Sequence, residues 1–341
     1  MVQLQMRISM RYSFIRNVKD RIPSLFFMAG AVRDFFRYTF NIIPKSPYAL
    51  MIEINNTCNL RCSMCWTKNA KRKKGLMSMS LYRKIISQAA ECGVKHVSLH
   101  TVGEPLLHKD LIEMIKLAKS KGLFVLVSTN GQLLNEELSR KLIDSGLDIL
   151  RLSLEGYSKE LYEKIRVGGS FERIVSNVKG FRKMRDEMGK KKPLMEINTV
   201  LIEEDFDYAR KFYMFWKQHV DQIKFSLAGN QAGYSPHTIH STLRKYFTRT
   251  YPCHLLWSTM AVTWDGEVSA CCIDFESRLK MGSLKKSTIK EIWNNALYRR
   301  YRNLQSEGKF DAMPLCGACD GRMMSPYKVY QLNRKIHKMV E

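Results

Sequence analysis

The sequence predicts an α/β fold, in which a partial (β/α)6, TIM-like barrel is followed by a smaller C-terminal domain. From residue 49 onward, short apolar segments alternate with segments whose apolar residues recur every three or four positions, as strands and amphipathic helices do. A polar stretch with several glycines begins near residue 229, and the elements after it are shorter. With 341 residues, the chain is long enough for one large and one smaller domain.

The six predicted strands span residues 49–54, 95–100, 123–128, 148–154, 195–201 and 222–227. Each of the first five precedes a segment with helical periodicity, such as the one that contains Leu111, Ile115 and Ala118. Strand–helix–strand units in one sheet have right-handed crossovers, so the strands should be parallel. Six such units are fewer than the eight of a closed barrel, which predicts a partial barrel.

Four regions are expected along the chain. Residues 1–48 form a basic N-terminal segment, in which aromatic residues recur at helical spacing from residue 31 to residue 40. Such a helix could bring residues 1–45 into peripheral contact with a membrane, or it could dock on the barrel or a second subunit, which we favour. Residues 49–228 form the barrel, 229–250 a linker, and 251–341 the C-terminal domain with a basic tail.

The composition limits the class of protein. A hydrophobic content of 45% is typical of a folded protein rather than a disordered one. Nine cysteines without an evident secretory signal predict metal ligation and a cytoplasmic location, peripheral at the inner membrane face if the N-terminal segment binds lipid. The net charge of +24 favours anionic partners or substrates. No nucleic-acid motif accompanies it, so nucleic-acid binding is not expected.

Three cysteines directly after the first strand carry the chemistry. Cys58, Cys62 and Cys65 have C-x3-C-x2-C spacing, and three thiolates can bind three corners of a 4Fe–4S cluster while the fourth iron stays open to a ligand. A zinc site usually needs a second pair of ligands nearby, and the next cysteine is Cys92. Cys92 stands alone at a helix end, and we expect it to be structural.

Polar residues at the ends of the next three strands are expected to face these cysteines, because parallel strands open their carboxyl ends on one face. Glu104 could accept a hydrogen bond from an ammonium group. Ser128 and Asn130 suit a ribose diol, and Ser153 and Arg166 could bind a carboxylate. The candidate residues in these loops and just downstream are Gly103, Glu104, Ser128, Asn130, Ser153 and Arg166.

The cysteine run and these loops together resemble the signature of the radical S-adenosylmethionine (SAM) superfamily over about residues 49–228. The resemblance implies a 4Fe–4S cluster on the three cysteines, with SAM on the open iron. It also implies that Gly103-Glu104 contacts the amino group of SAM and that Ser128 and Asn130 contact its ribose. Met64 stands where the family usually has an aromatic residue, and methionine can still pack against adenine.

A second set of cysteines follows the linker. Cys253, Cys271, Cys316 and Cys319 could close around one metal centre, and a four-cysteine zinc site fits the spacing equally well. The C-x12-G-x4-C arrangement from Cys253 to Cys271 resembles the SPASM or twitch extension of radical SAM enzymes, which implies an auxiliary 4Fe–4S cluster. Cys272 is the alternative ligand, and the glycine spacing favours Cys271.

The resemblance implies an oxidoreductase that cleaves SAM reductively to a 5′-deoxyadenosyl radical, which abstracts hydrogen from a substrate. It further implies a low-potential electron donor such as flavodoxin or ferredoxin, and an auxiliary cluster that assists oxidation or cross-linking. The basic surface favours a sugar-, cyclitol- or lipid-linked substrate. The alternatives are a peptide- or protein-modifying maturase and, from another class, a non-catalytic iron–sulfur protein for electron transfer or binding.

Overall fold

The computed structural model describes residues 42–201, 206–235, 252–323, 333–334 and 336–338. The chain divides into two compact units, Met1–Ile42 and Ile43–Glu341, and the description below concerns the second unit. The predicted N-terminal helix lies outside the described residues, as does the linker after residue 235. The helices of the described residues include none that is long and apolar enough to cross a membrane.

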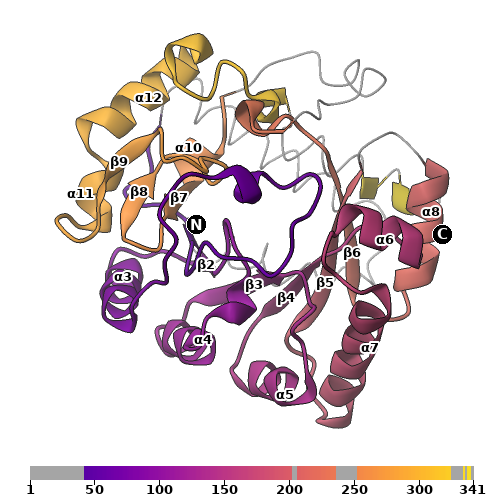
Figure 1. Ribbon diagram of the computed structural model, residues 1–341. Helices are drawn as coiled ribbons and strands as arrows, with labels where there is room; N and C mark the ends of the chain where they lie inside the picture. The colour runs from indigo at the N-terminus through magenta and orange to yellow at the C-terminus, as the bar shows by residue number, and fades with distance from the viewer. Residues whose placement is uncertain (1–41, 202–205, 236–251, 324–332, 335, 339–341) are drawn as a thin grey trace. The chain divides into compact units, whose positions relative to one another are not determined.

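Six parallel strands form the barrel part of the sheet, which confirms the predicted partial barrel (Figure 1). They pair side by side in sequence order, each parallel to the next. The sequence placed these strands to within two residues at each end. The strands are β1 (Ala49–Ile52), β2 (His96–Ser98), β3 (Phe124–Thr129), β4 (Ile149–Ser153), β5 (Leu194–Leu201) and β6 (Gln222–Leu227).

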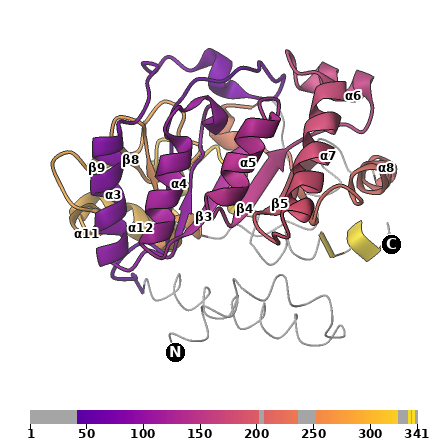
Figure 2. The same ribbon diagram turned by 90° about the horizontal axis from the view of Figure 1, so that it is seen from below.

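Helices follow the first five strands, and they stand side by side along the outer face of the sheet (Figure 2). Four of them begin at a serine or asparagine whose side chain accepts a hydrogen bond from a backbone N–H of the first turn, which stabilises the helix start. The helices are α3 (Met79–Glu91), α4 (Leu111–Ser120), α5 (Glu136–Asp144), α6 (Lys159–Ile165), α7 (Phe171–Glu187) and α8 (Phe206–Trp216). Short 3-10 turns, η2 (Trp66–Asn69) and η3 (Pro105–Leu107), lie in the loops after β1 and β2.

The C-terminal region continues the same sheet. Strand β7 (Thr259–Val262) pairs parallel with β1, and β8 (Glu267–Ser269) and β9 (Lys280–Ser283) follow it antiparallel, so that the sheet has nine strands. The sequence indicated short elements here but not their pairing with β1. Around them lie α10 (Leu255–Ser258), α11 (Ile289–Trp293), α12 (Ala296–Ser306), η4 (Gln231–Gly233), η5 (Phe310–Ala312) and η6 (Asp320–Met323).

The two faces of the parallel strands differ in chemistry. Successive side chains of a strand point to opposite faces, and the face covered by the helices carries the fully buried Leu50, Val97, Val125, Leu150 and Ile197. The inward face is mixed: the register puts Met51, Leu126 and Ile149 in the same row as Ser98. Most of its other side chains on β3 to β6 are polar, namely Ser128, Arg151, Ser153, Glu196, Asn198 and Lys224. These polar side chains suit the binding of a ligand better than the packing of a dry core.

Asp148, just before β4, ties three elements together. Its carboxylate accepts hydrogen bonds from the Nζ of Lys119 at 2.5 Å, the Nζ of Lys192 at 2.7 Å and the backbone N of Val125 at 2.9 Å. Burial alone would raise the pKa of Asp148, but these hydrogen bonds outweigh it and lower the pKa below its ordinary value. A lowered pKa stabilises the fold above the unfolded-state pKa, and that stability is lost as the pH falls through the folded-state pKa.

We therefore expect Asp148→Asn to lower the free energy of unfolding by about 2 kcal/mol at pH 7, since it weakens charge-assisted hydrogen bonds. The difference from the wild type should shrink as the pH falls from about 4, the ordinary pKa of an aspartate, through the lower pKa of folded Asp148. Urea unfolding at pH 7 and at about pH 3 measures this. Asp207→Asn, in an exposed pair with Lys211 at 2.6 Å, is the control and should change stability little. A deficit for Asp148→Asn that is equal at both pH values would contradict the expectation.

Candidate functional site

The first cysteine loop is held at the carboxyl end of β1 by the last residue of α6 and the segment that follows it. The backbone N of Arg61 donates to the carbonyl of Val167, and that of Ser63 donates to the carbonyl of Ile165, both at 2.9 Å. Within the loop, Cys65 N donates to the carbonyl of Cys62 at 3.1 Å. These backbone bonds place all three predicted ligand cysteines on the face where the strands end.

Asn130, after β3, contacts the same loop. Its Nδ2 donates to Asn59 Oδ1 at 2.8 Å and approaches Cys58 Sγ at 3.8 Å, and its Oδ1 accepts from the N of Gln132 at 3.0 Å. The backbone N of Leu60 also points to Cys58 Sγ, at 3.4 Å. The side chain of Asn130 thus supports the cysteine loop, and its contact with a ribose stays a prediction.

Glu104 joins the loops after β2 and β3. Its carboxylate is buried and accepts hydrogen bonds from Thr129 Oγ1 at 2.6 Å, Asn130 N at 2.8 Å and Leu106 N at 3.0 Å. Burial raises the pKa of Glu104, while these hydrogen bonds lower it in part. The carboxylate therefore fixes the two loops against each other, and its predicted contact with an ammonium group stays a prediction.

Gly103 lies against the start of the cysteine loop in a backbone conformation that few other residues adopt. Its φ is +85°, and a Cβ added there would come within 2.4 Å of Asn55 Oδ1 and 2.7 Å of the Asn55 carbonyl oxygen. The next backbone N, that of Glu104, donates to the carbonyl of Thr57 at 2.8 Å. The glycine is needed here because the two loops pack backbone to backbone.

Arg166 lies beside the cysteines and is paired with a residue that the sequence analysis did not single out. Its Nε donates to Glu155 Oε2 at 2.5 Å, and its Nη1 lies 3.6 Å from Cys62 Sγ. Both charged side chains are nearly buried, at 11% and 1% exposure. Burial raises the pKa of Cys62, and the guanidinium of Arg166 opposes this. The positive charge thus favours the thiolate, the form that binds iron.

The hydroxyls of Ser128 and Ser153 lie 3.1 Å apart across β3 and β4. They open on the inward face at the level of the cysteine loop, where they could bind a polar ligand together. Met64 is half-buried in that loop. The structure therefore places all the predicted SAM-contacting residues at one end of the sheet, and the role of each stays a prediction.

The second set of cysteines also comes together, from three separate segments. Burial raises the pKa of Cys253, and the nearby thiols of Cys271, Cys319 and Cys316 raise it further. Cys272 lies in the same environment. Its hydrogen bond with Cys271 is the main cause that raises the pKa of Cys271, and burial raises that pKa further. Four thiols suit a 4Fe–4S cluster, and the choice between Cys271 and Cys272 stays open.

Asn230, which follows β6, joins the barrel to the segment of Cys316 and Cys319 by three hydrogen bonds. The N of Asn230 donates to Asp320 Oδ2 at 2.7 Å, its Nδ2 donates to the Ala318 carbonyl at 2.5 Å, and its Oδ1 accepts from Asp320 N at 3.1 Å. Gln231 and Ala232 next to it have φ of +47° and +58°, a conformation that costs free energy for residues other than glycine. The loop of Cys316 and Cys319 is thereby fixed to the end of the barrel.

The sequence analysis missed three side chains that organise these two sites, namely Glu155, Asn59 and Asn230. Glu155 follows Ser153 by two residues, so the alternation of strand side chains could have placed it on the inward face. No local signal marks Asn59 or Asn230, because their partners lie more than seventy residues away in sequence. In the described residues, no three possible ligand side chains converge closely enough for a single metal ion.

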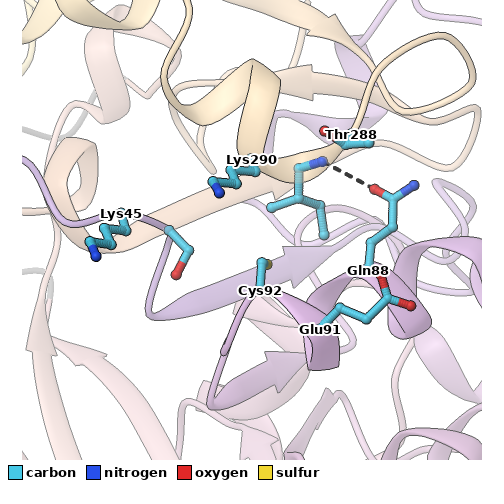
Figure 3. A pocket seen from close by; sticks show the side chains of 8 residues that line it. Lys45, Gln88, Glu91, Cys92, Thr288 and Lys290 are labelled. Atoms are coloured by element: carbon cyan, nitrogen blue, oxygen red, sulfur yellow. Dashed lines mark hydrogen bonds between the residues drawn. The ribbon is translucent and has the colours of Figure 1, made fainter.

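A separate pocket of about 390 Å³, lined in part by residues that precede β1 and β2, lies at the amino end of the strands (Figure 3). Cys92, at the C-terminal end of α3, lines this pocket. It precedes β2 in the chain, whereas the cysteine loop follows β1. Gln88 accepts a hydrogen bond from the N of Ile289 at 3.0 Å, which joins α3 to α11 across the pocket. This pocket is therefore remote from the cysteine loop at the carboxyl ends of the strands.

Comparison with protein families matches both regions. The model of the radical SAM superfamily matches residues 52–208, and that of the SPASM iron–sulfur cluster-binding domain matches residues 253–320. Such domains carry 4Fe–4S clusters and use SAM. The chemistry of the two thiol sets fits these cofactors.

Two curated relatives illustrate the range of similarity. A tungsten-containing aldehyde ferredoxin oxidoreductase cofactor-modifying protein of Pyrococcus furiosus is 30% identical over 162 residues, 46% of this chain and 44% of that protein. PqqA peptide cyclase of Rhizobium meliloti is 26% identical over 308 residues, 80% of each chain. The chain spans less than half the length of the first three curated relatives it matches.

Solved structures share the fold. SuiB of Streptococcus suis, bound to the precursor peptide SuiA, gives a TM-score of 0.65 at 18% identity, over 94% of this chain and 84% of that one. BtrN in complex with AdoMet and 2-DOIA gives 0.56 at 21% identity, over 80% and 92%. At these identities the similarity concerns the fold alone.

Proposed function

This chain belongs to the radical SAM superfamily and has a C-terminal SPASM domain, and we propose that it is an enzyme that modifies a peptide or protein. The observation that carries the proposal is the similarity to PqqA peptide cyclase across 80% of both chains. That alignment extends well beyond residues 52–208, the region that the radical SAM model matches. It supports the peptide class better than the sugar-, cyclitol- or lipid-linked substrate that the basic surface suggested.

The residues at the strand ends have distinct tasks in this proposal. Cys58, Cys62 and Cys65 would hold three corners of the first 4Fe–4S cluster, and Arg166 would stabilise the thiolate of Cys62. When bound, the reduced cluster and SAM supply a 5′-deoxyadenosyl radical, which takes a hydrogen atom from a carbon of the substrate. Ser128 and Ser153 would orient the nucleoside, and Glu104 would hold the loops after β2 and β3 against each other.

The second cysteine set would complete an oxidation. A substrate that has lost a hydrogen atom must lose one more electron and a proton to become a stable oxidised or cross-linked product. Cys253, Cys271, Cys316 and Cys319 would hold the acceptor of that electron, fixed to the barrel by Asn230. The first electron would come from a low-potential donor such as flavodoxin or ferredoxin.

The test is anaerobic incubation of the cluster-loaded, reduced protein with SAM and with peptides encoded near its gene. We expect 5′-deoxyadenosine by liquid chromatography, and a product peptide that has lost two hydrogen atoms by mass spectrometry. Absence of 5′-deoxyadenosine with every substrate would favour the non-catalytic electron-transfer alternative. Turnover of a sugar or cyclitol, with no peptide changed, would overturn the peptide class while keeping the radical chemistry.

A further inference from the structure

Helix α12 turns a polar, buried face toward the segment of Cys253. This face carries Tyr298, Arg302 and Gln305. The side-chain oxygen of Gln305 accepts a hydrogen bond from the backbone N of Cys253 at 2.9 Å. Arg302 Nε donates to the carbonyl of Leu256 at 2.9 Å, and Leu256 N in turn donates to the carbonyl of Cys253 at 3.1 Å. One face of α12 therefore holds the segment that carries the first cysteine of the second set.

Arg302 is a fully buried cation. Its Nη1 donates to the carbonyl of Trp293 at 2.8 Å, and its Cζ lies 4.2 Å from the centre of the Trp293 ring and 4.7 Å from that of Tyr298. Among the residues that the structure describes, no carboxylate pairs with it, and its buried Nη2 has no hydrogen-bond partner. Burial lowers the pKa of Arg302 to about 10, so the group is charged at neutral pH. A buried charge without a counter-ion costs free energy.

Tyr298 adds a second polar group to the same patch. Its hydroxyl is fully buried and makes no hydrogen bond within the described part of the chain. Burial raises the pKa of Tyr298, and the thiol of Cys271 raises it further, which places the hydroxyl near the second cysteine set. A buried hydroxyl without a partner also costs free energy. Two polar groups that need a partner therefore lie together beside Cys253 and Cys271.

An anionic centre on the second cysteine set would satisfy both groups. Four thiolates outweigh the positive charge of a 4Fe–4S core, so the whole centre is an anion. It becomes more negative when it accepts an electron, and the carboxylate of Asp274, which also lies near Cys271, makes that addition harder. A buried cation nearby lowers the electrostatic cost of the added electron.

We propose that Arg302 and Tyr298 set the reduction potential of the auxiliary cluster, the arginine as its buried counter-charge and the tyrosine as a hydrogen-bond donor near Cys271. The inference rests on the proposed function, in which the second cysteine set accepts an electron. That electron comes from the substrate radical left by hydrogen abstraction. The substrate releases a proton at the same time, and the cluster is reduced by one electron. Both residues would act through the cluster and not on the substrate.

Two variants should lower the midpoint potential of the auxiliary cluster. Arg302→Met removes the cation and should make reduction about fivefold less favourable. Tyr298→Phe removes only the hydroxyl, and the lost hydrogen bond should make reduction about twofold less favourable. An EPR-monitored redox titration measures both, in the full-length chain with Cys58, Cys62 and Cys65 replaced by alanine, so that the signal comes from the auxiliary cluster.

Tyr298→Phe also separates this role from a structural one. Because the hydroxyl has no partner among the described residues, its removal should leave the free energy of unfolding of the cluster-free protein unchanged. Iron content should stay at about four atoms per chain. A lower potential at unchanged stability and iron content is therefore the result expected for a residue that acts on the cluster.

Arg300→Met is the matched control, because Arg300 lies on the exposed side of α12. It removes the same charge where solvent screens it, and it should leave the potential unchanged. An equal shift in Arg300→Met and Arg302→Met would mean that surface charge in general sets the potential, which overturns the proposal. Should Arg302→Met not retain its cluster, a wild-type potential in Tyr298→Phe overturns it. The titration contains neither SAM nor substrate, so the turnover assay with peptides tests the proposed function separately.

Discussion

Replacing Cys62 by alanine is expected to reduce the formation of 5′-deoxyadenosine from SAM to background. Cys62 is the most buried thiol of the first loop, at 7% exposure, and it lies 3.6 Å from Arg166 Nη1. With only two thiols left, a three-corner site cannot hold its cluster. Iron content should fall from about eight to about four atoms per chain, because the second cysteine set keeps its own cluster.

Cys92→Ala is the matched control for this experiment. Cys92 is half-buried at the end of α3, at the amino end of the strands and away from the loop, so its removal should leave iron content and SAM cleavage unchanged. Full SAM cleavage by Cys62→Ala would contradict the assignment of the first site. Equal loss of iron in the two variants would contradict the assignment of Cys62 as a cluster ligand and of Cys92 as a structural residue.

Local patterns in the sequence predicted most of the barrel. Alternating apolar segments and the cysteine spacing depend on neighbours along the chain, so β1 to β6 and the first cysteine loop were located from sequence. Pairing of β7 with β1 joins segments more than two hundred residues apart. No periodicity in either segment specifies that partner, which is why the continuous nine-stranded sheet was not predicted.

For the candidate site too, the sequence predicted where residues lie but not which residues they contact. Glycine and acidic residues at the strand ends could be placed together on one face from sequence, because parallel topology alone brings those ends together. The partners of each side chain depend on tertiary packing. Glu104 was expected to meet a ligand ammonium, and in the structure it accepts hydrogen bonds from Thr129 and Asn130. Arg166 was expected to meet a carboxylate, and in the structure its carboxylate partner is Glu155.

The pairing of Arg166 with Glu155 leads to the second large effect. Arg166→Met should lower the free energy of unfolding by about 3–5 kcal/mol, because Glu155 is left as a buried charge without its partner. The double variant Glu155→Gln, Arg166→Met should recover much of that loss, since no unpaired charge remains. Urea unfolding of the cluster-loaded wild type, the single variants Arg166→Met and Glu155→Gln, and the double variant under anaerobic conditions gives the coupling free energy of the pair.

Arg166 should also influence the cluster, through its contact with Cys62. A cation beside a cluster thiolate stabilises the more negative, reduced state, so Arg166→Met should lower the midpoint potential of the SAM-binding cluster in an EPR-monitored titration. Arg166→Lys keeps the positive charge, so the midpoint potential should stay close to that of the wild type. Its free energy of unfolding should still fall, because lysine lacks the planar fork that fits Glu155. If Arg166→Met had an unchanged free energy of unfolding but weaker SAM binding, the arginine would act only by binding the carboxylate of SAM. An unchanged potential in both variants would mean that its charge does not reach the iron.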